Sequence, residues 1–266
     1  MIGTGPPMHD KERFALFPER AYPGASQTPT LDQMGVDLTA QARQGKLAPV
    51  IGRDKDLERV IQVLSRSPSP HTGIRKNNIV LISDLIGEPG RSLRTMAIVE
   101  GVAQLMISHR APAVAPGSEA QESSWMFYCL EKLQDKRLVT LDLDLLGAGA
   151  QSQSEFEERF RRIIEELRYS QDCIIFIDEA HTLVAFAQSV FGAAEGIGVA
   201  PRRVPALDRG EIQCIGASTL DEYRKHFEQD PALQRHFQEV IVHEMVATDE
   251  AILNQSGDSD STQEQG

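Results

Sequence analysis

Residues 173–181 read Cys-Ile-Ile-Phe-Ile-Asp-Glu-Ala-His, and this run constrains the fold more than any other part of the sequence. Consecutive large apolar residues are typical of a parallel strand that is buried on both faces of its sheet. Asp178 and Glu179 then follow at the carboxyl end of the strand, where open α/β sheets place their ligands. Paired carboxylates at this position suit an ATPase that holds magnesium and activates a water molecule. The alternative interpretation is a buried strand followed by two solvated acids.

The composition is that of an acidic chain with enough apolar residues for a sizeable core. Of 266 residues, 41% are hydrophobic, and 27 Lys and Arg against 39 Asp and Glu give a formal net charge of -12. This balance argues against a nucleic-acid surface, because phosphate contacts need clustered cations. No stretch approaches the about 18 apolar residues of a membrane span, and the start lacks a basic segment followed by an apolar core. We therefore expect no nucleic-acid or membrane partner and a soluble, intracellular protein in the cytoplasm, with import into an organelle as the alternative.

The three cysteines do not form a recognisable metal or disulfide pattern. Cys129, Cys173 and Cys214 are an odd set without metal-ligand spacing, and two of them lie within apolar, strand-like runs. We expect buried thiols in a reducing compartment.

Short apolar runs recur along the chain and alternate with segments of helical spacing. Strands that alternate with helices favour a parallel α/β sheet. The expected strands are residues 79–82, 138–143, 173–177, 212–216 and 240–242. The sequence therefore predicts a five-stranded parallel sheet flanked by helices.

Three segments between these strands have the spacing of amphipathic helices. Apolar residues recur at i, i+3, i+4 and i+7 in residues 57–64, and similar spacing continues through residues 97–106. A third helix covers residues 156–167, and Ser154 is expected to cap it with Glu157 three residues later. Residues 108–124 are rich in Ala, Pro, Ser and Gly and are expected to form a surface insertion.

The two ends of the chain differ in composition from its centre. Residues 1–30 are rich in Pro and Gly without a sustained apolar period, and we interpret them as a flexible leader. Residues 247–266 are rich in Ser, Gln, Asp and Glu and are expected to form a disordered acidic tail. Residues 31–246 form the predicted α/β domain.

Several runs of this sequence closely resemble the first ATPase domain of the Clp chaperones, the AAA+ unfoldases and disaggregases of the ClpB and ClpC kind. The resemblance covers residues 31–242 with interruptions. It implies a P-loop NTPase-like (AAA+) large α/β subdomain that lacks the family's helical lid subdomain. The matching runs are 31–33 (Leu-Asp-Gln), 44–47 (Gln-Gly-Lys-Leu), 49–54 (Pro-Val-Ile-Gly-Arg-Asp), 87–90 (Gly-Glu-Pro-Gly), 97–101 (Ala-Ile-Val-Glu-Gly), 155–159 (Glu-Phe-Glu-Glu-Arg), 177–179 (Ile-Asp-Glu), 215–217 (Ile-Gly-Ala) and 221–224 (Asp-Glu-Tyr-Arg).

The resemblance implies a binding site for ATP and magnesium. Val50 and Ile51 match the residues that contact adenine, and the run 87–90 matches the start of the phosphate loop. Arg94 and Thr95 stand nearest to the Lys-Thr of that loop, and Thr95 matches the hydroxyl that binds magnesium. The implied nucleotide-binding residues are Val50, Ile51, Gly87, Glu88, Pro89, Gly90, Arg94 and Thr95.

The resemblance also implies a role in catalysis for four residues. Asp178 would hold magnesium, and Glu179 would activate the attacking water. Thr219 matches a polar residue that positions this water, although it could instead cap the helix that follows. Arg235 matches the first of two arginines that reach the γ-phosphate of a neighbouring subunit, although it could instead be a surface cation. The second arginine position is His236, a weaker substitute.

The phosphate loop departs from the family pattern. Gly-x-x-x-x-Gly-Lys-Ser/Thr uses its second glycine to wrap the phosphates, its lysine to neutralise them and its hydroxyl to bind magnesium. Counted from Gly87, the last three positions are Ser92, Leu93 and Arg94. The insertion at residues 83–86 also separates the preceding strand from the loop. We therefore expect weak ATP binding and little hydrolysis, as in a pseudo-ATPase.

The loop that grips substrate in the family is changed as well. Family members carry Lys-Tyr-Arg-Gly or a similar run before Glu-Phe-Glu-Glu-Arg, and its aromatic ring holds a threaded polypeptide. Residues 151–154 read Gln-Ser-Gln-Ser instead. A serine offers little apolar area for a moving substrate, so threading of unfolded polypeptide by this chain alone is not expected.

Three hypotheses about function follow. In the first, the chain is a degenerate AAA+ relative that associates with Clp subunits in protein quality control and regulates them through Arg235. In the second, it is a functional ATP-hydrolysing chaperone subunit that assists unfolding or disaggregation. In the third, the insertions at 83–86 and 108–124 mark a truncated or mispredicted gene product without a role.

Overall fold

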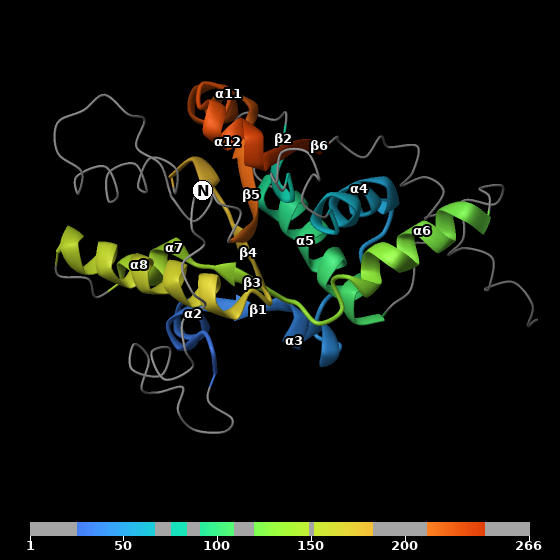
Figure 1. Cartoon of the computed structure of the whole chain (residues 1–266), viewed down its shortest axis with the longest axis horizontal. Helices are drawn as coiled ribbons and strands as arrows, with labels where there is room; N and C mark the ends of the chain where they lie inside the picture. Colours follow the sequence, from blue (N-terminus) through green and yellow to red (C-terminus); the bar gives the residue numbers. More distant parts are fainter. Residues whose placement is uncertain are drawn as a thin grey trace, which may run out of the picture.

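The fold is an α/β sheet with helices on both faces, as Figure 1 shows for the computed structural model. The structure describes residues 26–66, 76–83, 91–108, 120–148, 152–182 and 212–242. The predicted phosphate-loop residues Gly87, Glu88, Pro89 and Gly90 lie outside these ranges. Most of the predicted leader and the whole predicted tail lie outside them too.

Within the described residues, six strands form one sheet in the order β1-β3-β4-β5-β2-β6. All neighbouring strands pair in parallel except β1, which pairs antiparallel with β3. The five predicted strands are present and parallel, so the predicted fold class is confirmed, and β1 adds a sixth. The strands are β1 (Gly35–Asp37), β2 (Asn78–Ser83), β3 (Arg137–Leu141), β4 (Cys173–Ile177), β5 (Gln213–Thr219) and β6 (Phe237–Val242).

The helices form a layer on each side of the sheet. In Figure 1, α4, α5 and α6 lie on one side, and α2, α7 and α8 lie on the other. Among the described residues, none of the helices is both long and apolar enough to cross a bilayer. The helices are α2 (Pro29–Met34), α3 (Leu38–Arg43), α4 (Asp54–Leu64), α5 (Arg91–Ser108), α6 (Ala120–Glu131), α7 (Leu143–Gly147), α8 (Gln153–Ser170), α11 (Leu220–His226) and α12 (Pro231–His236).

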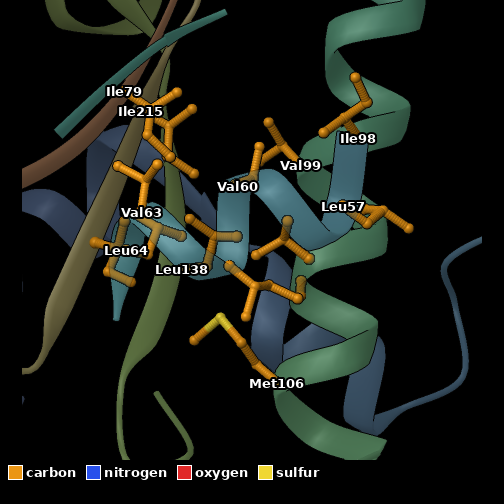
Figure 2. Close-up of a cluster of buried hydrophobic side chains, with 14 of the residues drawn as sticks. Leu57, Val60, Val63, Leu64, Ile79, Ile98, Val99, Met106, Leu138 and Ile215 are labelled. Atoms are coloured by element: carbon orange, nitrogen blue, oxygen red, sulfur yellow. The ribbon is translucent and has the colours of Figure 1, made fainter. Parts of the chain in front are cut away.

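Each helical layer buries its own apolar cluster against the sheet. The first cluster joins α4, α5 and α6 to the strands, and Figure 2 shows Leu57 and Val60 of α4 between α5 and the sheet. The second cluster joins α8 to the opposite face. Phe160 of the second cluster and Phe176 of the first are among the largest fully buried side chains. Alternate residues of a strand face opposite sides of its sheet. Leu81 and Ala217 accordingly belong to the first cluster, and Ile82 belongs to the second.

The segment before α4 is held in place by the side chains of two charged residues, one on β3 and one on α8. Arg137, the first residue of β3, donates hydrogen bonds to Asp37 (2.9 Å) and Asp32 (2.7 Å). Glu166 of α8 is 1% exposed and accepts the backbone N–H groups of Thr30 (3.0 Å) and Leu31 (3.0 Å). These contacts hold α2 and β1 in place, because they satisfy donors and charges that would otherwise be buried without partners.

Several boundaries differ from the sequence-based predictions. Ser152, not Ser154, caps α8, since its hydroxyl accepts the backbone N–H of Glu155. Helix α5 begins at Arg91, six residues before the predicted start, because the segment before the apolar period continues in helical geometry. Part of the predicted surface insertion is helix α6, which begins at Ala120.

All three cysteines are buried and free, as predicted. Burial raises the pKa of Cys173 to about 11 and that of Cys214 to about 12. Burial also raises the pKa of Cys129. The thiolate is the reactive form, so these groups are unreactive near neutral pH while the protein is folded.

Candidate functional site

The paired carboxylates stand at the carboxyl edge of the sheet, where the sequence places them. Asp178 follows β4 directly, and its Oδ1 accepts the backbone N–H of Glu179 at 2.9 Å. Glu179 is exposed and has a φ of 52°. This left-handed conformation is uncommon for residues other than glycine, and such residues cluster at functional sites.

The turn that carries these carboxylates lies directly over β5. A Cβ added at Gly216 would lie 2.5 Å from the Cβ of Ala180. Gly216 pairs in register with Ile177, the last residue of β4. A glycine is therefore required here, because any side chain on Gly216 would collide with the residue that follows Asp178 and Glu179.

Thr219 ends β5 beside the last residue of β2, Ser83, with which it pairs in register. Its hydroxyl accepts the backbone N–H of Glu222 at 3.1 Å and so caps α11. A threonine hydroxyl has one proton to donate and two acceptor lone pairs, so a capping hydroxyl can still donate its proton. The predicted role in positioning water stays a prediction, and the capping role is present.

The structure thus brings two predicted residues, and one that was not predicted, to one edge. Strands β4, β5 and β2 are neighbours in the sheet, and Asp178, Thr219 and Ser83 stand at their carboxyl ends. Ligands of open α/β sheets bind at such an edge. Ser83 was not predicted as a site residue, since sequence reasoning treated it only as the start of an insertion.

Arg94 and Thr95 lie on the fourth and fifth residues of α5. Arg94 is half-buried, whereas Thr95 is 1% exposed. In a phosphate loop the Lys-Thr pair stands at the start of the helix, where backbone N–H groups point at the ligand. Both residues lie further along the helix than that pattern places them, which favours weak phosphate binding by these two side chains.

The predicted adenine contacts lie beside the middle of α5. A Cβ added at Gly101 would lie 3.2 Å from Cγ2 of Val50, so Val50 packs against that helix. Ile51 is 54% exposed. An exposed apolar side chain next to a packed one is available for an apolar ring such as adenine, and the role of both residues stays a prediction.

The two residues at the predicted arginine-finger position differ in exposure. Both end α12, just before the edge strand β6. Arg235 is exposed, whereas His236 is 7% exposed. Arg235 alone of the two is therefore accessible to another subunit.

The carboxylate turn continues into a histidine that was not predicted as a site residue. The ring of His181 lies 5.9 Å from that of His226 on α11, and His226 Nε2 lies 3.1 Å from Glu222. Within the described ranges, no group of three or more His, Cys, Asp or Glu residues has a geometry that could hold a metal ion. The pair therefore does not form a separate metal centre in this part of the chain.

The mostly parallel sheet with paired carboxylates at its carboxyl edge fits a P-loop NTPase-like fold of the AAA+ class. A solved structure, the closed state of Hsp104 with ATPγS and FITC casein, matches with a TM-score of 0.60 at 36% identity, covering 85% of this chain and 32% of that chain. No family model matches the chain.

Comparison with curated proteins identifies the family more narrowly. The ATP-dependent Clp protease ATP-binding subunit ClpA homolog of Cyanidium caldarium is 45% identical over 225 residues, 84% of this chain and 22% of that protein. ClpB of Oceanobacillus iheyensis is 45% identical over 82% of this chain and 23% of its own length. Chloroplastic ClpC2 of Arabidopsis thaliana is 46% identical over 83% of this chain and 20% of its own length. The chain belongs to the Clp family of AAA+ chaperones, and it spans about a fifth of the length of these relatives.

Proposed function

We propose that the chain binds nucleotide weakly and acts by associating with Clp-type AAA+ subunits, whose activity it regulates. The observation that carries this proposal is the exposure of Arg235 next to the edge strand β6. An arginine finger acts on the nucleotide of a neighbouring subunit, so its effect does not depend on a working site in its own chain. This regulation would serve protein quality control, in the cytoplasm or in an organelle.

Weak nucleotide binding is supported by the phosphate-loop sequence and by α5. The chain lacks Gly-Lys-Ser/Thr, and Thr95 is buried. Charge-assisted hydrogen bonds to phosphate each contribute about 1.5–3 kcal/mol, so losing the lysine contact lowers affinity at least about tenfold. Any magnesium that accompanies the nucleotide would neutralise phosphate charge. Asp178 fits as its ligand and Glu179 as the group that orients water.

Association through Arg235 can be tested with an intact Clp chaperone. We expect the wild-type chain to bind the chaperone and to change its ATPase rate, and Arg235→Ala to reduce that change at least about tenfold, because a finger contributes about 10³–10⁵ to turnover when it is fully engaged. Binding is measured by co-purification and the rate by phosphate release.

Arg224→Ala is the matched control, since Arg224 is also exposed and lies on the neighbouring helix α11. This variant should behave as the wild type. Failure of the wild-type chain to associate with the chaperone, or equal effects of the two variants, would contradict the proposal.

A second candidate is a functional ATPase that assists unfolding or disaggregation of polypeptides. The specific observation in its favour is the conformation of Glu179, whose φ of 52° places it in the left-handed region directly after Asp178. Backbone strain of this kind costs about 1–3 kcal/mol and is retained where the surrounding structure demands it.

Turnover by the purified chain distinguishes the two candidates. If the chain hydrolyses ATP, Glu179→Gln should lower the rate by at least about 100-fold, because a general base contributes about 10²–10⁴. The nearby Glu222→Gln, which removes a carboxylate at the same edge, is the control and should retain most of the rate. A basal rate that Glu179→Gln leaves unchanged would reject this candidate.

A further inference from the structure

The described part of helix α6 carries apolar side chains on its outer surface as well as on its buried side. Its buried side chains join the first cluster, and they are Met126, Cys129 and Leu130. Three further side chains are aromatic and about half exposed, namely Trp125 (44%), Phe127 (51%) and Tyr128 (50%). A helix that is apolar all round is normally buried, and gathered exposed apolar side chains mark interaction sites. The outer surface of α6 is therefore a candidate docking surface.

Two of the aromatic rings form an ordered row with a lysine. Trp125 and Tyr128 are three residues apart and Lys132 follows four residues later, so the three lie on one side of the helix. The ring centres of Trp125 and Tyr128 are 5.9 Å apart, and Nζ of Lys132 lies 4.5 Å from the centre of the Tyr128 ring. Nζ also donates a hydrogen bond to the carbonyl of Ser65, the residue after α4, at 3.5 Å. The row is thus held in one geometry before a partner binds, which lowers the entropic cost of binding.

Helix α4 packs beside α6 and adds two arginines to this surface (Figure 1). Arg59 and Arg66 are seven residues apart, about two helical turns, and so stand on one side of α4. Burial, and then the charge of Arg59, lower the pKa of Arg66, so the two guanidinium groups repel each other. Arg59 donates a hydrogen bond to the side-chain oxygen of Gln62 (2.8 Å), and Arg66 to that of Gln238 (3.4 Å). Both acceptors are neutral, so these contacts leave the positive charges uncompensated.

The charges of this surface favour a particular kind of partner. A carboxylate placed between Arg59 and Arg66 would relieve their repulsion and form charge-assisted hydrogen bonds. The net charge of the chain, -12, has little effect on such a contact, because charges are screened beyond about 8 Å at physiological salt. Glu58 and Glu131 are exposed on the same two helices. They would face the headgroups of an anionic membrane, so a protein that directs its acids to the arginines fits better.

We propose that the outer surfaces of α4 and α6 bind an amphipathic helix of a partner protein. Its apolar side chains would cover the aromatic rings of Trp125, Phe127 and Tyr128, and acidic side chains on one flank would reach Arg59 and Arg66. A helix suits this surface because side chains of packed helices form ridges between which those of a third helix pack. Helices α4 and α6 have 11 and 12 residues, so the partner helix needs about three turns.

The fluorescence of Trp125 provides the test, because this is the only tryptophan of the sequence. Two synthetic helical peptides without tryptophan are added to the full chain. One has leucines on one face and glutamates beside them, and the other has lysines in place of the glutamates. The glutamate peptide should shift the emission to shorter wavelength, because the indole ring leaves water. It should bind at least about tenfold more tightly than the lysine peptide, because like charges oppose the second complex.

Three variants assign the binding to this surface. Tyr128→Ala, which keeps the fluorescent reporter, should weaken the glutamate peptide at least about tenfold, as the loss of an aromatic anchor does. Arg59→Glu should remove most of the preference for the glutamate peptide, since it replaces an attraction by a repulsion. Arg162→Glu is the matched control, because Arg162 is a 61% exposed cation on α8, in the other helical layer. It should leave both affinities unchanged.

Several results would overturn the inference. These are the absence of an emission shift at millimolar glutamate peptide, equal affinity for the two peptides, and unchanged binding in Tyr128→Ala. A shift with phosphatidylserine vesicles but not with the peptide would assign the surface to a membrane instead. A shift that grows with the concentration of the chain alone would assign it to a second copy. The measurement uses neither nucleotide nor a Clp chaperone, so its failure and that of the proposed function are distinguishable.

Discussion

Replacing Gly216 by alanine should destabilise the protein by about 1–3 kcal/mol, the usual cost of extra volume in a packed interior. The new methyl group would lie 2.5 Å from the Cβ of Ala180, closer than two carbons can approach. The backbone of β5 is fixed by pairing with β2 and β4, so the turn after β4 must move. Asp178 and Glu179 lie on that turn and would be displaced with it. Urea denaturation followed by circular dichroism measures the loss.

A compensating substitution tests this cause directly. Ala180→Gly removes the colliding atom, and we expect the double variant with Gly216→Ala to be more stable than the sum of the single effects by at least about 0.5–1 kcal/mol. The control is Gly147→Ala, where the added Cβ would lie 3.8 Å from the ring of Phe156, an ordinary contact. Its effect should stay within about 0.5 kcal/mol. Additive effects at Gly216 and Ala180 would show that the collision is not the cause.

Replacing Arg137 by alanine should lower the free energy of unfolding by about 2–3 kcal/mol at pH 7. The guanidinium contacts Asp32, Asp37 and the hydroxyl of Thr28, and removal of one partner from a half-buried pair leaves the others uncompensated. The side chains of Arg137, Asp32 and Asp37 are 22–32% exposed, so the expected loss of stability lies between those for surface and for buried ion pairs. The matched control is Arg161→Ala, whose pair with Glu158 is 46–49% exposed and should matter little.

The same contacts make this part of the stability depend on pH. Burial acts to raise the pKa of Asp32, but hydrogen bonds from Ser26 and Arg137 outweigh it, so the pKa lies below its ordinary value of 3.8. The pKa of Asp37 is lowered too: burial acts to raise it, but hydrogen bonds, the first from Thr39, outweigh it. A lowered pKa in the folded state stabilises the protein above the unfolded value, and this is lost as pH falls through the folded value.

We therefore expect the difference in stability between the wild type and Arg137→Ala to be full at pH 7 and to shrink below about pH 3.8. Denaturation curves recorded between pH 7 and pH 3 measure this difference. A difference that stays constant across this range would show that Arg137 acts through packing of its alkyl stem and not through its charge.

The sheet was predictable because burial dictates its sequence. The run Cys173–Ile177 is apolar at every position, and the structure buries every one of its residues. The structure also buries every residue of Asn78–Ser83, whose four central residues are Ile, Val, Leu and Ile. Strands buried on both faces leave a strong signal in one sequence, because polar residues at these positions cost free energy.

The missed elements are those whose formation depends on distant contacts. Strand β1 has three residues, and its position depends on the pairing with β3 and on Arg137, 100 residues away from Asp37. Helix α6 buries Met126, Cys129 and Leu130 but exposes Trp125, Phe127 and Tyr128, so apolar residues surround it and no single apolar face marks it in the sequence. No local sequence pattern predicts either element.

The candidate site was predictable in part, because some of its residues stand at the ends of buried strands. Asp178 and Thr219 directly end buried strands, and the order of parallel strands brings them to one edge. The start of α5 was placed too late because Arg91 and Ser92 break the apolar period that was used to find it.

The two edge strands of the sheet differ in the length of backbone that they offer to a further strand. At one end β1 offers three residues of backbone to a further strand, too few for a lasting ladder. At the other end β6 offers six, and no described strand pairs with its outer side. Unpaired N–H and C=O groups along a strand are a template for another chain. A second polypeptide that extends this sheet would therefore add beside β6, at the end of the molecule where Arg235 also lies.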